Sequence, residues 1–372
     1  MQRYILFILF ISLIYPRSAD WDADTVQTSF LSYKVELFSD GYVIPWGMSF
    51  LPDGDLLVSD ISGKIYRVNR NDGKKAMISG VPKVFYKGQG GMLDVEVHPE
   101  FEKNNLVYFS FSDLVGNTSF TAIVRAKLIE DQLINLETIY KADEINYSKS
   151  NYHFGSRIVL DNKYLYFSIG DRGEREDAQD LNLPNGKIHR LFLNGDVPLD
   201  NPFMNNSGEK SSIWCYGNRN PQGLTIGKNG TLWELEHGPK GGDELNIIKK
   251  GNNYGWPIIT YGINYNGTII SDYTHMDGME QPVWHWTPSI AVCGMKIYER
   301  DKFYQWNGNI LVTSLKFEYL ERVVIENNKR ISSEIIYKPG SRVRDVEVGP
   351  NGNIYVALED PGRIVKLLPV IN

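Results

Sequence analysis

Residues 345–356 read Asp-Val-Glu-Val-Gly-Pro-Asn-Gly-Asn-Ile-Tyr-Val. A short alternating strand is followed by a Pro/Asn-Gly turn and by a second strand that is richer in apolar residues. A similar order recurs in five earlier segments, which begin at Gly47, Leu93, Ser156, Gly223 and Met295. Asp-Gly and Asn-Gly pairs in these turns favour hairpins because both residues tolerate positive φ. The chain is therefore predicted to repeat one antiparallel hairpin six times.

A candidate third strand follows each hairpin. Three of these strands are plainly alike, at residues 63–68, 186–191 and 362–367, and the other places are filled by 123–125, 245–248 and 320–324. Repeated hairpins with no helical period between them predict an all-β fold, a six-bladed β-propeller. A pair of β-sandwiches is the alternative, but it would not need similar copies.

Two kinds of segment lie outside the copies. Residues 33–37 precede the first copy and could supply the outer strand that closes the ring with the last blade. The long polar segments 172–185, 196–216 and 255–290 are rich in Gly and Pro. They are predicted to be loops on a rim, where binding and catalytic residues usually lie.

Composition limits the class of protein. The chain has 372 residues, 42% of them hydrophobic and 23% charged, with a formal net charge of -6. The apolar fraction supports a large core and excludes a disordered chain. The negative net charge argues against a nucleic-acid partner, because such proteins usually carry a basic patch. Two domains would be the default for this length, but the sixfold pattern predicts a single ring.

The N-terminus indicates the compartment. Residues 1–19 have the form of a signal peptide: Arg3, an apolar run over residues 4–15, then Pro16 and a small-residue cleavage region. The run is too short to span a bilayer, which takes about 20 residues; an uncleaved anchor is the alternative. We therefore expect an exported protein, periplasmic or secreted, without stable membrane insertion and with residues 20–372 as one propeller domain. Cys215 and Cys293 could pair in an oxidising compartment.

The predicted topology gathers distant residues at one rim. The first strand of each blade lines the channel and starts at the same rim, so residues at these starts converge in space. The residues at these starts, together with Lys316 after a second strand, form one candidate set: Gln89, His153, Arg219, Asn220, Trp286, Lys316, Arg342 and Arg344.

Such a cationic set favours an anion. Guanidinium groups bind carboxylates at two points and stack on flat rings. A single imidazole among cations should have a lowered pKa and stay neutral near pH 7, which is the form a general base needs. The set therefore predicts a flat polyanionic cofactor, with His153 placed to take a proton from a substrate hydroxyl. Taken singly, each Arg is more simply a solvated surface charge and the His a structural hydrogen-bonding group.

A second candidate site lies in residues 236–244. Gly238 and Pro239 can turn their carbonyls outward and Glu244 can add charge, which suits a hard cation such as Ca²⁺. A Gly-rich turn before a strand is the simpler alternative, and the spacing does not fit an EF-hand loop.

These motifs resemble the pyrroloquinoline-quinone (PQQ)-dependent glucose/sorbosone dehydrogenase family, and most closely its soluble aldose sugar dehydrogenases. The likeness runs from about residue 43 to residue 368. It is carried by Gly-Gln-Gly-Gly-Met-Leu-Asp-Val (88–95), His-Phe-Gly-Ser-Arg (153–157), Arg-Asn-Pro-Gln-Gly (219–223), Glu-His-Gly-Pro (236–239), Asn-Tyr-Gly-Trp-Pro (253–257) and Arg-Val-Arg-Asp-Val (342–346).

The resemblance implies roles for individual residues. His153 would be the base that removes the anomeric hydroxyl proton while hydride passes from the sugar C1 to the quinone, and Arg219 with Asn220 would polarise the quinone oxygens. Gln89, Lys316, Arg342 and Arg344 would hold the cofactor carboxylates, and Trp286 would lie against the ring and the sugar. Two Ca²⁺ sites are implied: one on the carbonyls of Gly238 and Pro239, and a structural one on Glu244 and the Tyr254 carbonyl.

The sequence differs from the glucose-oxidising branch of this family at one position next to His153. Tyr152 precedes His153, where the glucose-oxidising branch has an acidic residue, so a broad aldose range is expected rather than strict glucose specificity. The product would be a lactone, and the electrons would pass to an external acceptor. Two other functions are weighed against this one: a propeller lactonase, which needs metal ligands at the channel centre, and a non-catalytic extracellular binding propeller, which would not need the His and Arg set.

Overall fold

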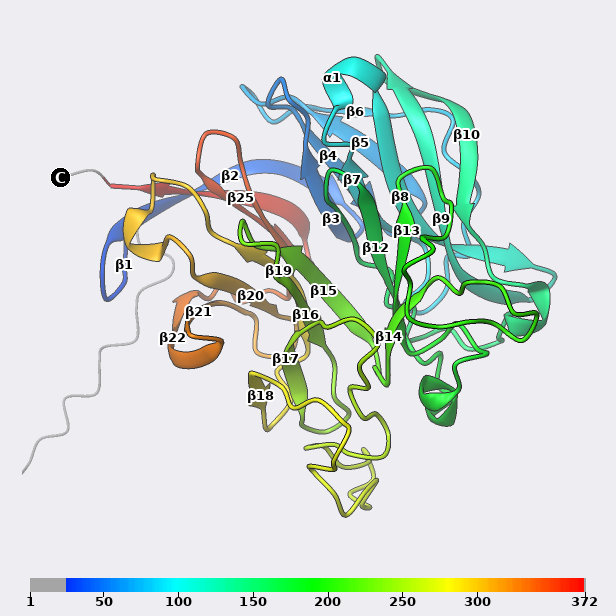
Figure 1. Cartoon of the computed structure of the whole chain (residues 1–372). Coiled ribbons are helices and arrows are strands. Elements are labelled where there is room, and N and C mark those ends of the chain that lie inside the picture. Colours follow the sequence, from blue (N-terminus) through cyan, green and yellow to red (C-terminus); the bar gives the residue numbers. More distant parts are fainter. Residues whose placement is uncertain (1–24, 371–372) are drawn as a thin grey trace, which may run out of the picture.

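The computed structural model describes residues 25–370, which form six antiparallel sheets arranged as the blades of a propeller (Figure 1). Each innermost strand contacts the innermost strands of both neighbouring blades, and the last of them contacts the first, so the ring is closed. The all-β six-bladed propeller is confirmed. The predicted signal peptide, residues 1–19, lies outside the described residues.

Every blade has the same strand order, from the channel outward. The innermost strands are β3 (Pro45–Phe50), β7 (Met92–Val97), β11 (Ile158–Leu160), β15 (Pro221–Ile226), β19 (Val292–Ile297) and β23 (Val343–Val348). The second strands are β4 (Leu56–Asp60), β8 (Leu106–Val115), β12 (Tyr164–Ile169), β16 (Leu232–Glu236), β20 (Ile310–Ser314) and β24 (Ile354–Leu358).

The outer half of each blade follows. The third strands are β5 (Lys64–Val68), β9 (Thr118–Ile129), β13 (Lys187–Phe192), β17 (Asp243–Ile247), β21 (Tyr319–Glu326) and β25 (Gly362–Pro369). The fourth strands are β6 (Lys75–Met77), β10 (Gln132–Tyr140), β14 (Ile213–Tyr216), β18 (Trp284–Trp286), β22 (Lys329–Tyr337) and β2 (Ser32–Tyr42). β2 also pairs with the short β1 (Val26–Gln27).

The ring is closed by strands from the two ends of the chain. β2 pairs antiparallel with β25, with Val35 opposite Leu367. Figure 1 shows the blue β2 beside the red β25. The prediction that residues 33–37 close the last blade is confirmed. The closure joins segments more than 300 residues apart, so loss of either end is expected to open this blade.

Three details differ from the expectation. The predicted rim loops 196–216 and 255–290 contain β14 and β18. These outer strands are short and have no alternating pattern long enough to identify them from the sequence. The third copy begins at Ile158 rather than Ser156, because Ser156 has a φ of 78°, outside the β region. In the Asn351-Gly352 turn only the glycine has positive φ, at 78°.

The helices are short. They are α1 (Phe101–Asn104) and the 3₁₀ turns η1 (Glu144–Asn146), η2 (Arg175–Gln179) and η3 (Tyr304–Trp306). None of the helices within residues 25–370 has the length and apolar character that crossing a membrane requires.

Hydrophobic side chains pack between neighbouring blades. Six clusters fill the six blade–blade boundaries, for example Leu57 with Val95 between the first two blades and Leu235 with Val312 between the fourth and fifth. Cys215 and Cys293 are both buried free thiols, so the pairing that the sequence left open does not occur in this structure. Each blade therefore depends on both neighbours for burial of its apolar faces.

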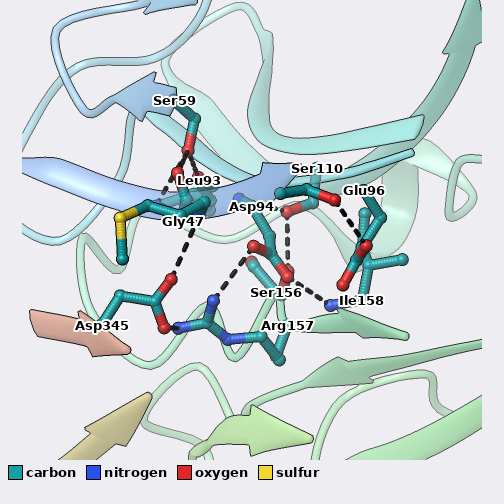
Figure 2. Close-up of polar contacts among 12 residues, drawn as sticks. Gly47, Ser59, Leu93, Asp94, Glu96, Ser110, Ser156, Arg157, Ile158 and Asp345 are labelled. Carbon is teal, nitrogen blue, oxygen red and sulfur yellow. Dashed lines mark hydrogen bonds and ion pairs between the residues drawn. The ribbon is translucent and has the colours of Figure 1, made fainter. Parts of the chain in front are cut away.

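A buried ionic group occupies the channel (Figure 2). Arg157, which directly precedes β11, donates Nη1 to Asp94 Oδ1 at 3.0 Å and lies 3.3 Å from Asp345 Oδ1 through Nη2. Its Nε donates to the carbonyl of Gln222 at 2.8 Å, and its guanidinium lies 4.5 Å from the centre of the Trp46 ring. A Cβ added to Gly47 would meet Asp94 at 2.3 Å, which explains the glycine there. Arg157 thus joins its own blade to four others.

Candidate functional site

His153 lies at the rim, on the loop that leads into β11. Its φ is 55°, and its backbone N–H donates to Gln89 Oε1 at 2.7 Å. Nδ1 of the ring is 2.6 Å from Asp171 Oδ1, and 14% of the side chain is exposed. Burial lowers the pKa of His153, the hydrogen bond to Asp171 opposes this, and the charge of Arg219 lowers it further. The ring is therefore neutral at pH 7.

Asp171 orients this imidazole and was not predicted. It follows β12, is 1% exposed, and also accepts hydrogen bonds from Trp256 Nε1 at 2.9 Å and from the Gly173 N–H at 2.8 Å. Burial alone would raise its pKa, but the bond to His153 and the charges around it bring the pKa below the usual value. Asp171 therefore stays ionised and favours the His153 tautomer that carries the proton on Nδ1, which leaves Nε2 free to accept one.

Arg219 and Asn220 stand beside this pair, at the start of β15. Nη1 of Arg219 donates to the carbonyls of His237 and Gly238 at 2.9 and 3.0 Å. Asn220 Oδ1 accepts the Gly155 N–H at 3.1 Å, two residues after His153. The structure therefore brings Gln89, His153, Arg219 and Asn220 together as the sequence predicted.

Arg342 and Arg344 form a second cationic group. Their Nε atoms donate to the two oxygens of Glu359, at 2.7 and 2.6 Å. Arg344 Nη1 is also 3.3 Å from Gln222 Oε1, which in turn lies 3.2 Å from His237 Nε2. Two guanidiniums thus share one carboxylate. Their charges, like that of Arg219, lower the pKa of His237, after the larger effect of its burial.

Lys316 and Trp286 are placed differently from each other. Lys316 is exposed, and within residues 25–370 its ammonium forms no ion pair; it lies 5.2 Å from the centre of the Phe317 ring. Trp286 is 7% exposed, packs in the core between the fourth and fifth blades, and donates Nε1 to Glu321 at 3.1 Å. The predicted contact of Trp286 with a ring and a sugar therefore stays a prediction, made on a side chain buried in the core.

The predicted metal ligands lie on and after β16 and β17. The Gly238 carbonyl accepts from Arg219. Glu244 stands opposite Glu236 in the β16–β17 register, and Tyr254 is buried with its hydroxyl bonded to the Ile247 carbonyl at 2.6 Å. In the part of the chain that the structure describes, no three His, Cys, Asp or Glu side chains are close enough to hold a metal.

A cavity of about 450 Å³ opens over these residues. Three residues of the candidate set line it, namely Gln89, His153 and Arg219, together with Pro239 of the second candidate site. The other lining residues include Tyr152, Asp171, Arg175, Trp256, Asn264 and Tyr265. A neutral imidazole oriented by a carboxylate, a guanidinium nearby and aromatic walls suit proton removal from a hydroxyl beside a group that gains negative charge.

The sequence of the chain shows which family it belongs to. Residues 42–366 match the model of the glucose/sorbosone dehydrogenase family, and the chain belongs to that family. It is similar to the aldose sugar dehydrogenase YliI of Escherichia coli, with 38% identity over 99% of this chain and 100% of the relative.

Solved structures show the same relationship. The apo form of the soluble aldose sugar dehydrogenase from Escherichia coli has a TM-score of 0.86 and 36% identity, covering 91% of this chain and 100% of that one. The PQQ-bound aldose sugar dehydrogenase from Streptomyces coelicolor has a TM-score of 0.74 and 28% identity, covering 91% and 98%. The family and these neighbours support a PQQ-dependent sugar dehydrogenase, an oxidoreductase that acts on a small sugar.

Proposed function

We propose that the chain oxidises aldose sugars at the C1 hydroxyl to the lactone and passes the electrons to an external acceptor. The observation that carries this proposal is the His153–Asp171 pair at the wall of the cavity, beside Arg219. His153 Nε2 takes the hydroxyl proton, Asp171 holds the ring in the required tautomer, and Arg219 offers positive charge where negative charge develops.

The cofactor proposal rests on the charge at the rim. PQQ is a flat polyanion, and when bound it supplies the acceptor for hydride from the sugar C1. Arg219, Lys316, Arg342 and Arg344 carry four positive charges there. Glu359 offsets part of the charge of Arg342 and Arg344, and the Asp171 carboxylate lies near Arg219. Gln89 and Asn220 add amide groups. This excess of donors in an acidic protein fits the cofactor carboxylates and quinone oxygens.

Calcium fits the acceptor-rich region around Glu244. Glu244 has a pKa raised to about 7, chiefly by burial. Glu234 Oε1 and Asn246 Oδ1 are buried without a hydrogen-bond partner among residues 25–370. Such oxygens suit a hard cation, with carbonyls such as that of Tyr254 completing the ligand set. We therefore propose a structural Ca²⁺ site at Glu244 and the Tyr254 carbonyl. We propose a second Ca²⁺ site on the carbonyls of Gly238 and Pro239.

Calcium is expected to stabilise the protein through Glu244. A Ca²⁺ concentration about 100 times Kd contributes about 2.7 kcal/mol, which raises the Tm of a chain of this size by roughly 5 °C. In Glu244→Gln the rise should be less than half of this, whereas Glu137→Gln, on the outer strand β10, should keep it. Scanning calorimetry with and without Ca²⁺ measures the difference. Equal rises in both variants would show that Glu244 is not a ligand.

The pH profile tests the base. Because neutral His153 must accept a proton and its pKa lies below 6.5, kcat/KM should be lost only as the pH falls through that lowered pKa. In Asp171→Asn the acid limb should move to still lower pH, because the carboxylate had favoured the imidazolium, and kcat should fall about 10- to 100-fold. Steady-state kinetics between about pH 5 and pH 8 measure both effects. A limb above pH 6.5, or an upward shift in the variant, would contradict the assignment.

Two alternatives are less well supported. A propeller lactonase needs a ring of metal ligands at the channel centre, and here Arg157 and its two carboxylates occupy that place. A binding propeller has no need of an oriented imidazole. Dye reduction by several aldoses with PQQ and Ca²⁺, run beside a lactone hydrolysis assay, separates the functions. Hydrolysis without dye reduction would favour the lactonase.

We also propose that the protein is exported, because residues 1–19 have the form of a signal peptide.

A further inference from the structure

The loop that carries His153 has an unusual backbone. His153 and Ser156 have φ values of 55° and 78°, in the left-handed region that non-glycine residues rarely occupy. Such conformations persist only where the surrounding structure holds them, and they concentrate at functional sites. The hydrogen bond to Gln89 holds the N–H of His153, but the backbone that precedes His153 in the chain needs a separate support.

Arg172 supplies that support from the loop after β12. Its side chain is buried, with 1% of the residue exposed. Nη2 donates to the Ser150 carbonyl at 2.6 Å, and Nη1 donates to the Tyr152 carbonyl. The guanidinium lies 3.5 Å from the centre of the Phe154 ring. The contacts therefore fall on both sides of His153 along the chain.

The charge of Arg172 has no conventional partner. Within residues 25–370 no carboxylate forms an ion pair with it. Burial lowers the pKa of Arg172 to about 9, so the guanidinium is still charged at pH 7. A buried cation is costly unless hydrogen bonds satisfy it. Here the two Nη atoms donate to the carbonyls of the 150–152 segment and, more weakly, to Ser119 Oγ at 3.4 Å, while Nε has no hydrogen-bond partner within residues 25–370.

We propose that Arg172 is a positioning residue for the catalytic base, because its guanidinium fixes the left-handed backbone that presents His153 to the cavity. Asp171 and Arg172 are consecutive and have separate roles. Asp171 orients the ring, whereas Arg172 holds the main chain just before His153 and packs against the Phe154 ring just after it. This inference rests on the proposed function for the role of His153, but the contacts themselves exist in the unloaded protein.

The test compares two buried arginines. Arg172→Met removes the bonds and the charge while keeping an unbranched apolar stem. Arg190→Met is the matched control: Arg190 is 3% exposed, donates to Asn201 at 2.8 Å and stacks 3.9 Å from the Trp214 ring, away from the cavity lining. Arg172→Lys keeps the charge and donors but loses the planar face.

Two readouts are measured. Histidine-selective NMR of the protein without cofactor follows the His153 ring. The titratable and charged groups around this ring are Asp171, Arg219, Arg172, Tyr152 and His237. In Arg172→Met its titration midpoint should rise, because a nearby cation has been removed, and its chemical shift should change. In the PQQ-loaded protein kcat should fall about 10- to 100-fold with little change in the sugar KM, as for a misplaced catalytic group. Arg172→Lys should recover part of kcat.

The result that overturns the proposal is a His153 titration and kcat in Arg172→Met that match those of Arg190→Met. Where Arg172→Met does not fold, Arg172→Lys decides: a His153 signal and kcat equal to wild type would reject a role for the planar guanidinium. Failure of wild-type protein to oxidise any aldose would refute the proposed function, and the NMR comparison would still judge the contact between Arg172 and the His153 loop.

Discussion

Replacing His153 with Gln is expected to lower kcat for aldose oxidation by about 10²- to 10⁴-fold, the usual contribution of a positioned general base. Gln keeps a polar side chain but cannot take up a proton at pH 7. Affinity for PQQ should change little, because the cations proposed to hold its carboxylates remain. Single-turnover kinetics on the loaded variant measure the loss apart from product release.

The control for this variant is His98→Gln. His98 lines a cavity at the other end of the innermost strands, with Pro99 and Lys296, so its loss should leave kcat near the wild-type value. A kcat in His153→Gln equal to the wild-type value would show that His153 is not the general base. A variant that no longer binds PQQ would place His153 in cofactor binding instead.

Arg157→Leu is expected to destabilise the fold by about 3–5 kcal/mol, the usual effect of removing one partner of a buried ionic group. Asp94 and Asp345 would remain in the channel without their shared cation. Burial already raises the pKa of Asp345 to about 7, and the charge of Arg157 is what chiefly opposes this rise. Urea unfolding followed by tryptophan fluorescence measures the change in free energy of unfolding.

Two comparisons sharpen that prediction. Arg67→Leu breaks the pairs of Arg67 with Asp53 and Asp55. Because the side chains of Arg67 and Asp53 are 28% and 45% exposed, the loss should be smaller than that in Arg157→Leu. Adding Asp345→Asn to Arg157→Leu should restore part of the stability, because one unpaired buried charge is removed. A loss at Arg157 no larger than that at Arg67 would mean that the channel group does not hold the blades together.

The fold was predictable because each copy repeats an alternating inner strand and a turn residue with a fixed role. The fourth strands were not, since β6, β14 and β18 are short edge strands whose pairing depends on the neighbouring third strand rather than on their own pattern. The closure by β2 and β25 was predictable because residues 33–37 alternate and stand outside the six copies.

The sequence predicted some residues of the site but not the partners that orient them. The starts of first strands gave Gln89, His153 and Arg219, and the end of one second strand gave Lys316. Antiparallel second strands end at the same rim where first strands start. Applied to every blade, this rule would also have pointed to Asp171 after β12, His237 after β16 and Glu359 after β24, the partners that the sequence analysis missed.

Other features could not have been read from the sequence. The left-handed backbone of His153 depends on Gln89 and Arg172, which are 64 and 19 residues away along the chain. Trp286 lies at the end of β18, opposite the start of β17, but its side chain is buried between two blades. In both cases tertiary packing, and not local sequence, determines where the side chain points.

The most direct test of the central claim uses purified protein titrated with PQQ in the presence of Ca²⁺ and then mixed, without oxygen or dye, with excess aldose. We predict saturable binding of one quinone per chain, weakened in Arg219→Leu, and loss of the oxidised-quinone absorbance on addition of sugar, with lactone formed in equal amount. Absence of PQQ binding, or bound quinone that stays oxidised with every aldose tried, would contradict a PQQ-dependent aldose dehydrogenase.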